Sequence, residues 1–321
     1  MTSDPISSGV LAGDARAVAR AISLVENETR EGAAVIGEIF GRTGHAYLIG
    51  VTGAPGSGKS TLVDRLAGEI RQDGLTVGII AVDPTSPFTG GAILGDRVRM
   101  SAHHADAGVF IRSMATRGHL GGLARATSDV AIVLDAAGKD MVIIETVGVG
   151  QDEVDIVRTA DISIVMLVPG TGDDVQAIKA GIMEIADIFV VNKADREGAD
   201  RLVQAVAANL SLQTFAPGEW MPPILKTEAT GGTGIAALWT EIGRYREHSA
   251  DRRQARRRAR QEVRLRELLA QRLLRHVEER LPAGEFDRLV DAVASRTIDP
   301  YSAADDIVKR LTSTFSLPTS E

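Results

Sequence analysis

The chain has 321 residues, 44% of them hydrophobic, which is enough to bury a large core. It contains no cysteine, and this excludes disulfides and thiolate-bound metals. The formal net charge is −7, the N-terminus lacks the pattern of a signal peptide, and no apolar run is long enough to cross a bilayer, so we expect a cytoplasmic protein without a membrane partner.

The charge is unevenly distributed along the chain. Residues 251–266 hold eight arginines against one aspartate and one glutamate, a local charge of +6, so the other residues carry −13. A basic helix on an acidic body favours pairing within or between subunits over nucleic-acid binding. The segment also lacks interleaved aromatic residues that would stack on bases, and we therefore expect no nucleic-acid partner.

The first 45 residues are predicted to be helical, because apolar residues recur there at three- and four-residue spacing. From residue 46 onward, short β-branched runs alternate with helix-length segments, as in parallel sheets that are buried on both faces. The predicted strands lie within 46–53, 76–83, 108–114, 141–146, 162–170, 187–195 and 223–229. The expected fold class is α/β, with a mostly parallel central sheet flanked by helices and with helical extensions at both ends.

Beyond residue 248 the strand pattern stops. Residues 251–281 are predicted to form one long helix with an apolar stripe, and shorter helices are expected at about 285–295 and 301–313. The stripe must be covered by another subunit or by the helix's own domain, so the helix is a candidate oligomerisation arm. We expect three regions, an N-terminal helical extension (1–45), a nucleotide-binding domain (46–247) and the C-terminal arm (248–321).

The stretch "GAPGSGKST" (53–61) matches the phosphate-loop pattern G-x-x-x-x-G-K-[ST] between an apolar strand and an amphipathic helix. Its glycines let backbone N–H groups close around phosphates, and the start of the helix adds a favourable dipole. Lys59 is predicted to reach the β- and γ-phosphates, and the Ser60 hydroxyl to bind Mg²⁺. The chain is therefore predicted to be a P-loop NTPase whose phosphate site is formed by Gly53, Ala54, Pro55, Gly56, Ser57, Gly58, Lys59, Ser60 and Thr61.

The stretch "VVNKAD" (190–195) ends an apolar strand with the pattern Asn-Lys-x-Asp. The Asp195 carboxylate is suited to accept hydrogen bonds from guanine N1–H and its 2-amino group, which adenine does not offer. Asn192 is expected to support the loop and the Lys193 stem to lie across the base. In the later loop "KTEATGGTG" (226–234), Ala229 is the candidate for contact with guanine O6, so the predicted ligands are GTP and GDP.

Three acids stand where a magnesium carboxylate is needed. Glu145 closes the strand "MVIIE" in the sequence E-T-V-G, where most GTPases have D-x-x-G. Asp83 ends another strand, and Asp96 follows it by 13 residues. Mg²⁺ takes oxygen ligands, usually one or two carboxylates with phosphates and water. Taken alone, Asp83 also fits an Asx turn before Pro84, and Asp96 a helix cap or a solvated acid.

Together these stretches, with "FIRSMATRGHLGGLA" (110–124), "ETVGVGQDEV" (145–154) and "PGTGDDVQAIKAGIMEIADIFVVNKAD" (169–195), resemble the MeaB/ArgK family of SIMIBI-class P-loop GTPases, whose mitochondrial relative is the MMAA protein. The resemblance covers nearly the whole chain. It implies that Ser60, Asp83, Asp96 and Glu145 hold Mg²⁺, that residues about 170–183 form an additional switch, and that the C-terminal helices form a homodimerisation arm.

The same resemblance implies a partner, methylmalonyl-CoA mutase or a related adenosylcobalamin-dependent acyl-CoA mutase. The GTPase would act as a chaperone that gates cofactor loading and protects or reactivates the mutase. Slow unaided hydrolysis is expected, because Val149 stands where many GTPases place a water-orienting glutamine. Lys59 and Glu145 are the catalytic candidates at the phosphates. Gln151 is a candidate that a partner brings into place, and Lys179 or Arg117 is a candidate charge donor to the transition state.

Two other functions remain open from the sequence. Three histidines at positions 103, 104 and 119 motivate a metallochaperone GTPase that delivers a metal to a metalloenzyme, although two are adjacent and cysteine is absent. A kinase linked to basic amino-acid transport is less favoured, because the guanine-reading motif argues against ATP and no acceptor site is recognisable.

Overall fold

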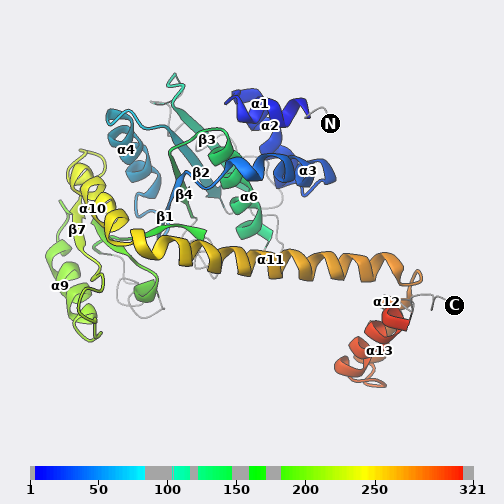
Figure 1. Ribbon diagram of the computed structural model, residues 1–321. Helices are drawn as coiled ribbons and strands as arrows, with labels where there is room; N and C mark the ends of the chain where they lie inside the picture. Colours follow the sequence, from blue (N-terminus) through cyan, green and yellow to red (C-terminus); the bar gives the residue numbers. More distant parts are fainter. Residues whose placement is uncertain are drawn as a thin grey trace. The chain divides into compact units, whose positions relative to one another are not determined.

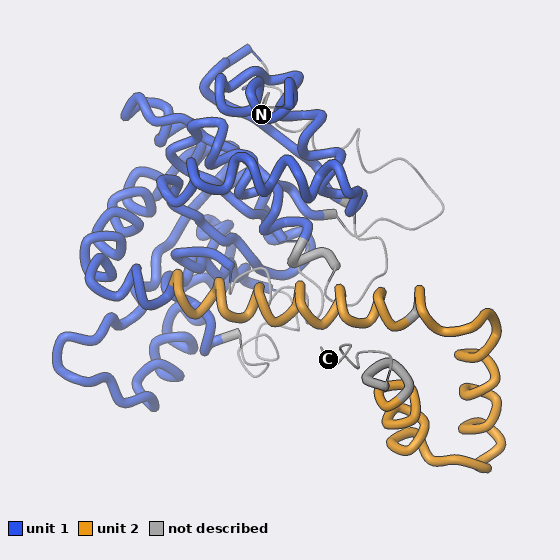
Figure 2. The backbone as a smooth tube through the Cα atoms, turned by 45° about the vertical axis from the view of Figure 1, so that its right-hand side comes forward, with its two compact units in different colours: residues 1–256 blue, residues 257–321 orange. Residues whose placement is uncertain are grey.

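The computed structural model describes residues 4–83, 103, 105–115, 122–146, 159–170 and 182–313. The chain divides into two compact units, residues 1–256 and residues 257–321 (Figure 2). The domain boundaries expected near residues 45 and 247 remain predictions.

The first unit is built on a parallel sheet whose seven described strands have the order β3-β2-β4-β1-β5-β6-β7 (Figure 1). This confirms the predicted α/β class. The strands are β1 (Tyr47–Gly53), β2 (Val77–Asp83), β3 (Val109–Ala115), β4 (Met141–Glu145), β5 (Ile162–Leu167), β6 (Ile188–Asn192) and β7 (Ile224–Thr227).

Alternate residues of the buried strands supply the two faces of the sheet. One face packs against α4 (Lys59–Gln72) and α10 (Ile235–His248) in a continuous core. The opposite face is divided. Its β2–β4 side is covered by α6 (Gly122–Ala136), and its β5–β6 side by α9 (Ala199–Leu210) with the short η3 turn (Ile182–Glu184).

The predicted N-terminal helices are α1 (Pro5–Leu11), α2 (Ala15–Glu26) and α3 (Arg30–Ile39), followed by η1 (Phe40–Arg42). Their apolar residues, including Val18, Ile22 and Val35, are buried in the same core as Val130 and Leu134 of α6. The N-terminal extension therefore covers one side of the sheet as part of the first unit.

An aspartate stands directly before β4, β5 and β6 at the amino-terminal edge of the sheet. In each case a carboxylate oxygen accepts a hydrogen bond from a backbone N–H at the beginning of a neighbouring strand. These bonds are Thr76 N–H to Asp140 at 2.8 Å, Leu48 N–H to Asp161 at 3.0 Å and Ser163 N–H to Asp187 at 2.9 Å. The aspartates thus help to fix the relative register of adjacent strands.

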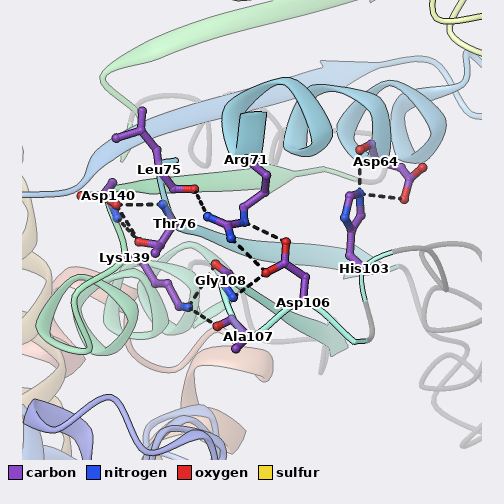
Figure 3. A network of polar contacts seen from close by, with 10 residues as sticks. All are labelled: Asp64, Arg71, Leu75, Thr76, His103, Asp106, Ala107, Gly108, Lys139 and Asp140. Carbon is purple, nitrogen blue, oxygen red and sulfur yellow. Dashed lines mark hydrogen bonds and ion pairs between the residues drawn. The ribbon is translucent and has the colours of Figure 1, made fainter. Parts of the chain in front are cut away.

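A polar network fastens the loop before β3 to α4 (Figure 3). Arg71, in the last turn of α4, donates from Nε and Nη2 to both carboxylate oxygens of Asp106, at 2.8 and 3.1 Å. The Gly108 N–H also donates to Asp106, at 2.8 Å. Two turns earlier on α4, the Asp64 carbonyl lies 3.0 Å from His103 Nε2. The hydrogen bonds from Arg71 and then from Gly108 hold the pKa of Asp106 below its usual value.

The long helix α11 (Ala250–Arg280) begins in the first unit and continues into the second, which also contains α12 (Glu285–Ala294) and α13 (Pro300–Ser313). These bounds confirm the three predicted C-terminal helices. Along α11, Leu265 is 67% exposed and Leu269 and Leu273 are each 56% exposed. Within the described ranges, no helix has the length and apolar character needed to span a membrane.

Because Arg71 lowers the pKa of Asp106, we expect the free energy of unfolding to depend on pH. Because the folded-state pKa of Asp106 is lowered, its contribution is complete above the unfolded value of about 3.9 and is lost as the pH falls through the folded value. Asp106→Asn should therefore lower the free energy of unfolding at neutral pH, by about 1 kcal/mol or less because the pair is partly exposed. Urea unfolding from neutral pH to about pH 3 should show the difference from wild type shrinking in acid.

The control is Glu247→Gln, which neutralises an exposed carboxylate of α10. An Asp106→Asn variant that stays as far below wild type in acid as at neutral pH would contradict the assignment.

Candidate functional site

The phosphate loop connects β1 to α4 at the carboxyl-terminal edge of the sheet. Gly53 and Gly58 adopt positive φ angles of 148° and 95°. A Cβ on Gly53 would lie 2.3 Å from the Met166 carbonyl oxygen, and one on Gly58 would lie 2.5 Å from Asn192 Nδ2. Both positions therefore require glycine, for reasons of backbone conformation and of space.

Within the predicted phosphate site, Ala54, Pro55, Gly56 and Thr61 are exposed, whereas Ser57 and Lys59 are buried. The Lys59 ammonium donates to the carbonyl oxygens of Gly53 at 2.6 Å and Ala54 at 3.2 Å. It thus lies inside the ring of backbone formed by the loop, in the first turn of α4. The positive end of the helix dipole is directed at the same place, so the loop combines a cation with backbone donors suited to an anion.

Two of the four predicted magnesium ligands lie side by side. Ser60 Oγ, in the first turn of α4, donates to Glu145 Oε1 at the end of β4, at 2.6 Å. Glu145 is only 6% exposed. The next residue, Thr146, extends the strand pairing through its N–H to Val51 O at 3.0 Å, and its hydroxyl donates to Thr52 Oγ1 at 2.9 Å. These bonds hold the end of β4 beside the phosphate loop.

The remaining predicted metal and catalytic residues are less fully placed. Asp83 closes β2 at the same edge of the sheet, in register with Ala115. Asp96, Gln151 and Lys179 lie outside the described residues. Among the described side chains, no group of three or more His, Cys, Asp or Glu residues is placed to hold a metal ion.

A hydroxyl and a carboxylate in contact are nevertheless a donor set of the kind that Mg²⁺ uses together with nucleotide phosphates and water. Ser60 and Glu145 therefore fit the ion as partial ligands.

Asn192, at the end of β6, connects the phosphate loop with the loop that follows β7. Its Nδ2 donates to the Ser57 carbonyl at 2.8 Å, while its Oδ1 accepts from Thr227 Oγ1 at 3.0 Å and from the Ala229 N–H at 3.1 Å. The side chain is 2% exposed, so these bonds are shielded from water. The next residue, Lys193, has a φ of 55° and donates from Nζ to the Gly56 carbonyl at 2.7 Å.

The two predicted base-contacting residues lie on loops that Asn192 joins. Asp195 is exposed, three residues past the end of β6, and Ala229 is 3% exposed. The Ala229 N–H is donated to Asn192 Oδ1. Contact of Asp195 and Ala229 with guanine remains a prediction.

The structure adds two residues that the sequence motifs did not single out. Thr227 orients the Asn192 amide through its hydroxyl, and Arg65 of α4 donates from Nη2 to the Thr230 carbonyl at 2.9 Å. Arg65 follows Ser60 by little more than one turn of the same helix. A single helix therefore contacts the phosphate loop at its start and the base loop through Arg65.

Comparison with known proteins gives one consistent result. The chain matches the family model described as Methylmalonyl Co-A mutase-associated GTPase MeaB over residues 18–281. A protein of Pyrococcus abyssi, named only as a GTPase, is 53% identical over 303 residues, which cover 93% of this chain and 94% of the relative.

Two further similarities extend over much of the chain. The mouse (Mus musculus) protein named Methylmalonic aciduria type A homolog, mitochondrial, is 31% identical over 82% of this chain and 65% of its own length. A crystal structure of a protein named LAO/AO transport system kinase has a TM-score of 0.70 and 28% identity, and the match covers 96% of both chains.

The contacts of Asn192 predict the effect of its removal. Asn192→Ala leaves the buried Thr227 hydroxyl and the Ser57 and Ala229 backbone groups without these partners, which should loosen both loops. We expect the Kd for GDP, measured with a fluorescent analogue, to rise by about tenfold to a hundredfold, equivalent to about 1.4–2.8 kcal/mol.

Asn209→Ala is the matched control, because the Asn209 side chain donates only one hydrogen bond given by the structure, to Ala205 O within α9. A Kd within twofold of wild type for Asn192→Ala would refute the role of this amide.

Proposed function

We propose that the GTP cycle of this chain, which belongs to the MeaB family of methylmalonyl-CoA mutase-associated GTPases, serves an adenosylcobalamin-dependent acyl-CoA mutase. Family membership implies GTP binding and GTPase activity. The observation that carries the proposal is the family match across residues 18–281, which includes the phosphate loop and the Asn-Lys-x-Asp motif. The client that we propose is methylmalonyl-CoA mutase or a related acyl-CoA mutase.

Nucleotide recognition would use the two ends of the site. Lys59 and the backbone of residues 53–61 would hold the phosphates, and Asp195 would accept hydrogen bonds from guanine. Support comes from Asn192, which holds the two loops in contact through buried bonds of 2.8–3.1 Å. A ligand that binds both loops then meets groups whose spacing is already fixed, so less entropy is lost on binding.

Mg²⁺ would be held by Ser60 and Glu145, with Asp83 and Asp96 as the further proposed carboxylates. The ion would supply charge neutralisation at the β- and γ-phosphates. Glu145 is held at the edge of the sheet and Ser60 at the start of α4, so the positions of both proposed ligands are fixed by the fold.

Hydrolysis is proposed to be slow without a partner. Lys59 would stabilise negative charge on the phosphates, but Val149 can neither accept a proton nor orient water. We propose that the bound mutase places Gln151 to orient the water and that Lys179 donates charge to the transition state. The partner would then complete the catalytic machinery, which couples hydrolysis to recognition of the client.

The second unit is proposed to be a homodimerisation arm. Its described helices carry apolar side chains that are half-exposed or more within the unit, namely Val263, Leu265, Leu269, Leu273, Leu274, Phe286, Val290, Tyr301 and Val308. Leu265, Leu269 and Leu273 recur at four-residue steps and so share one face of α11. A second copy of the chain would cover such a face.

A first prediction concerns Glu145. Glu145→Ala removes the carboxylate beside Ser60, so the Mg²⁺ concentration for half-maximal turnover should rise and kcat should fall, each by about tenfold or more. Phosphate release across a Mg²⁺ titration gives both quantities. Glu184→Ala, at an exposed position of η3, is the control, and an unchanged Mg²⁺ dependence of Glu145→Ala would exclude the proposed role.

A second prediction tests the client. Purified methylmalonyl-CoA mutase should raise the GTP turnover of the wild-type protein by at least about tenfold, because a charge donor brought to the transition state is worth about 10³–10⁵ in other GTPases. The measurement is phosphate release with and without the mutase, using serum albumin as the control protein. Turnover that does not respond to the mutase would overturn the client assignment.

The kinase name of the similar crystal structure motivates a parallel measurement. In the same reaction, labelled γ-phosphate should appear as inorganic phosphate, and transfer to added arginine or ornithine would favour the kinase alternative.

A further inference from the structure

The beginning of α11 is fastened to the amino-terminal edge of the sheet by a chain of three side chains. The Tyr245 hydroxyl, near the end of α10, donates to Asp187 Oδ1 at 2.5 Å. Arg256 Nη1, in the second turn of α11, donates to the same hydroxyl and lies 3.5 Å from the Asp161 carbonyl oxygen. The Asp187–Tyr245–Arg256 joint therefore links the strand edge to the helix.

A second contact holds the same part of α11. The Arg253 guanidinium lies 5.4 Å from the centre of the Tyr47 ring and donates to the Ala46 carbonyl at 3.3 Å. Arg246, from the last turn of α10, lies 5.3 Å from the same ring. Cation–π contacts at these distances are favourable, and more so because Tyr47 is only 1% exposed.

The joint is well buried at its centre. Tyr245 is 1% exposed, and its ring lies edge-on to Trp220 at 5.1 Å between centroids. Trp220 Nε1 donates to the Asp187 carbonyl at 2.8 Å. Burial raises the pKa of Asp187, while the bonds from the Tyr245 hydroxyl and the Ser163 N–H oppose that rise. The bonds of Asp187 are thus partly shielded from water, which strengthens each of them relative to a bond at the surface.

One strand joins this joint to the proposed guanine site. Asp187 directly precedes β6, and Asn192 is the last residue of the same strand. All five residues of β6 are buried; residues 188–191 pair with β5 and residues 189–192 pair with β7. A short strand that is hydrogen-bonded on both sides is a rigid secondary element, the kind of element through which coupling between two sites is carried.

We propose that the Asp187–Tyr245–Arg256 joint couples occupancy of the guanine site to the first two turns of α11. When a nucleotide binds the loops beyond Asn192 and Thr227, the position of β6 is restricted further. The restriction reaches residues 250–256 through the Tyr245 hydroxyl and Arg256. Tyr245 and Arg256 are then positioning residues that act through the sheet, and the coupling is reciprocal between helix and nucleotide. The inference rests on the proposed guanine site and not on the identity of the client.

Hydrogen exchange of the full chain tests this coupling. In the wild type, saturating GDP should slow amide exchange in residues 250–256 by about fivefold or more, the lower end of typical coupling free energies. Tyr245→Phe keeps the ring against Trp220 but removes the hydroxyl, and Arg256→Gln removes the cation. Both variants should lose this nucleotide-dependent difference while still binding GDP.

Matched controls separate the joint from general effects. Tyr301→Phe removes the hydroxyl of a tyrosine that is 85% exposed, and Arg252→Gln changes an exposed arginine in the first turn of α11, and both should keep the wild-type response. Arg256→Gln also guards against a folding defect in Tyr245→Phe, because Arg256 lies partly in solvent.

Two results would overturn the coupling. One is the same GDP-dependent difference in Tyr245→Phe and Arg256→Gln as in the wild type, and the other is GDP binding to the wild type with no change in residues 250–256. Failure of GDP to bind the wild type would refute the guanine site itself, and the coupling with it.

Discussion

The geometry of the nucleotide site depends on one buried amide, the side chain of Asn192. An amide offers donors on its nitrogen and lone pairs on its oxygen, so it can satisfy the Ser57 carbonyl on one side and Thr227 and Ala229 on the other. A carboxylate at this position would offer no donor to Ser57, and an apolar side chain would satisfy neither loop. Because the loops come from β1, β6 and β7, this one side chain links the phosphate region to the base region.

The two edges of the sheet carry different kinds of polar group. At the carboxyl-terminal edge, the chemistry-bearing residues Lys59, Ser60, Glu145 and Asn192 follow or close strands, as expected for ligand sites in open parallel sheets. At the amino-terminal edge, Asp140, Asp161 and Asp187 are used internally, each accepting a backbone N–H of a neighbouring strand. The strands β4, β5 and β6 that join the two edges are short and buried.

Local sequence patterns predicted the strands, the phosphate loop, the Asn-Lys-x-Asp motif and the C-terminal helices, because each depends on residues within a few positions of one another. Contacts over long separations were not predictable in this way. Arg65 and Thr230 are 165 residues apart, and Tyr245 and Asp187 are 58 apart. Nothing in the spacing of α2 showed that its apolar face would pack against α6. Asp96, Gln151 and Lys179 lie outside the described residues, so their proposed roles stay predictions.

In the arginine-rich segment, residues 251–266, the change in composition and the boundary between the two compact units fall at different positions. Its charge of +6 favoured pairing with an acidic body, but the described contacts of Arg253 and Arg256 involve tyrosine rings and backbone carbonyl oxygens at the edge of the sheet. Further along, Arg266 pairs with Glu262 on the helix itself, at 2.9 Å. A tyrosine ring attracts a guanidinium through its quadrupole and carries no charge, so a count of acids and bases does not reveal such a partner. The composition changes near residue 250, but the first compact unit ends at Arg256, so the first two turns of α11 belong to that unit.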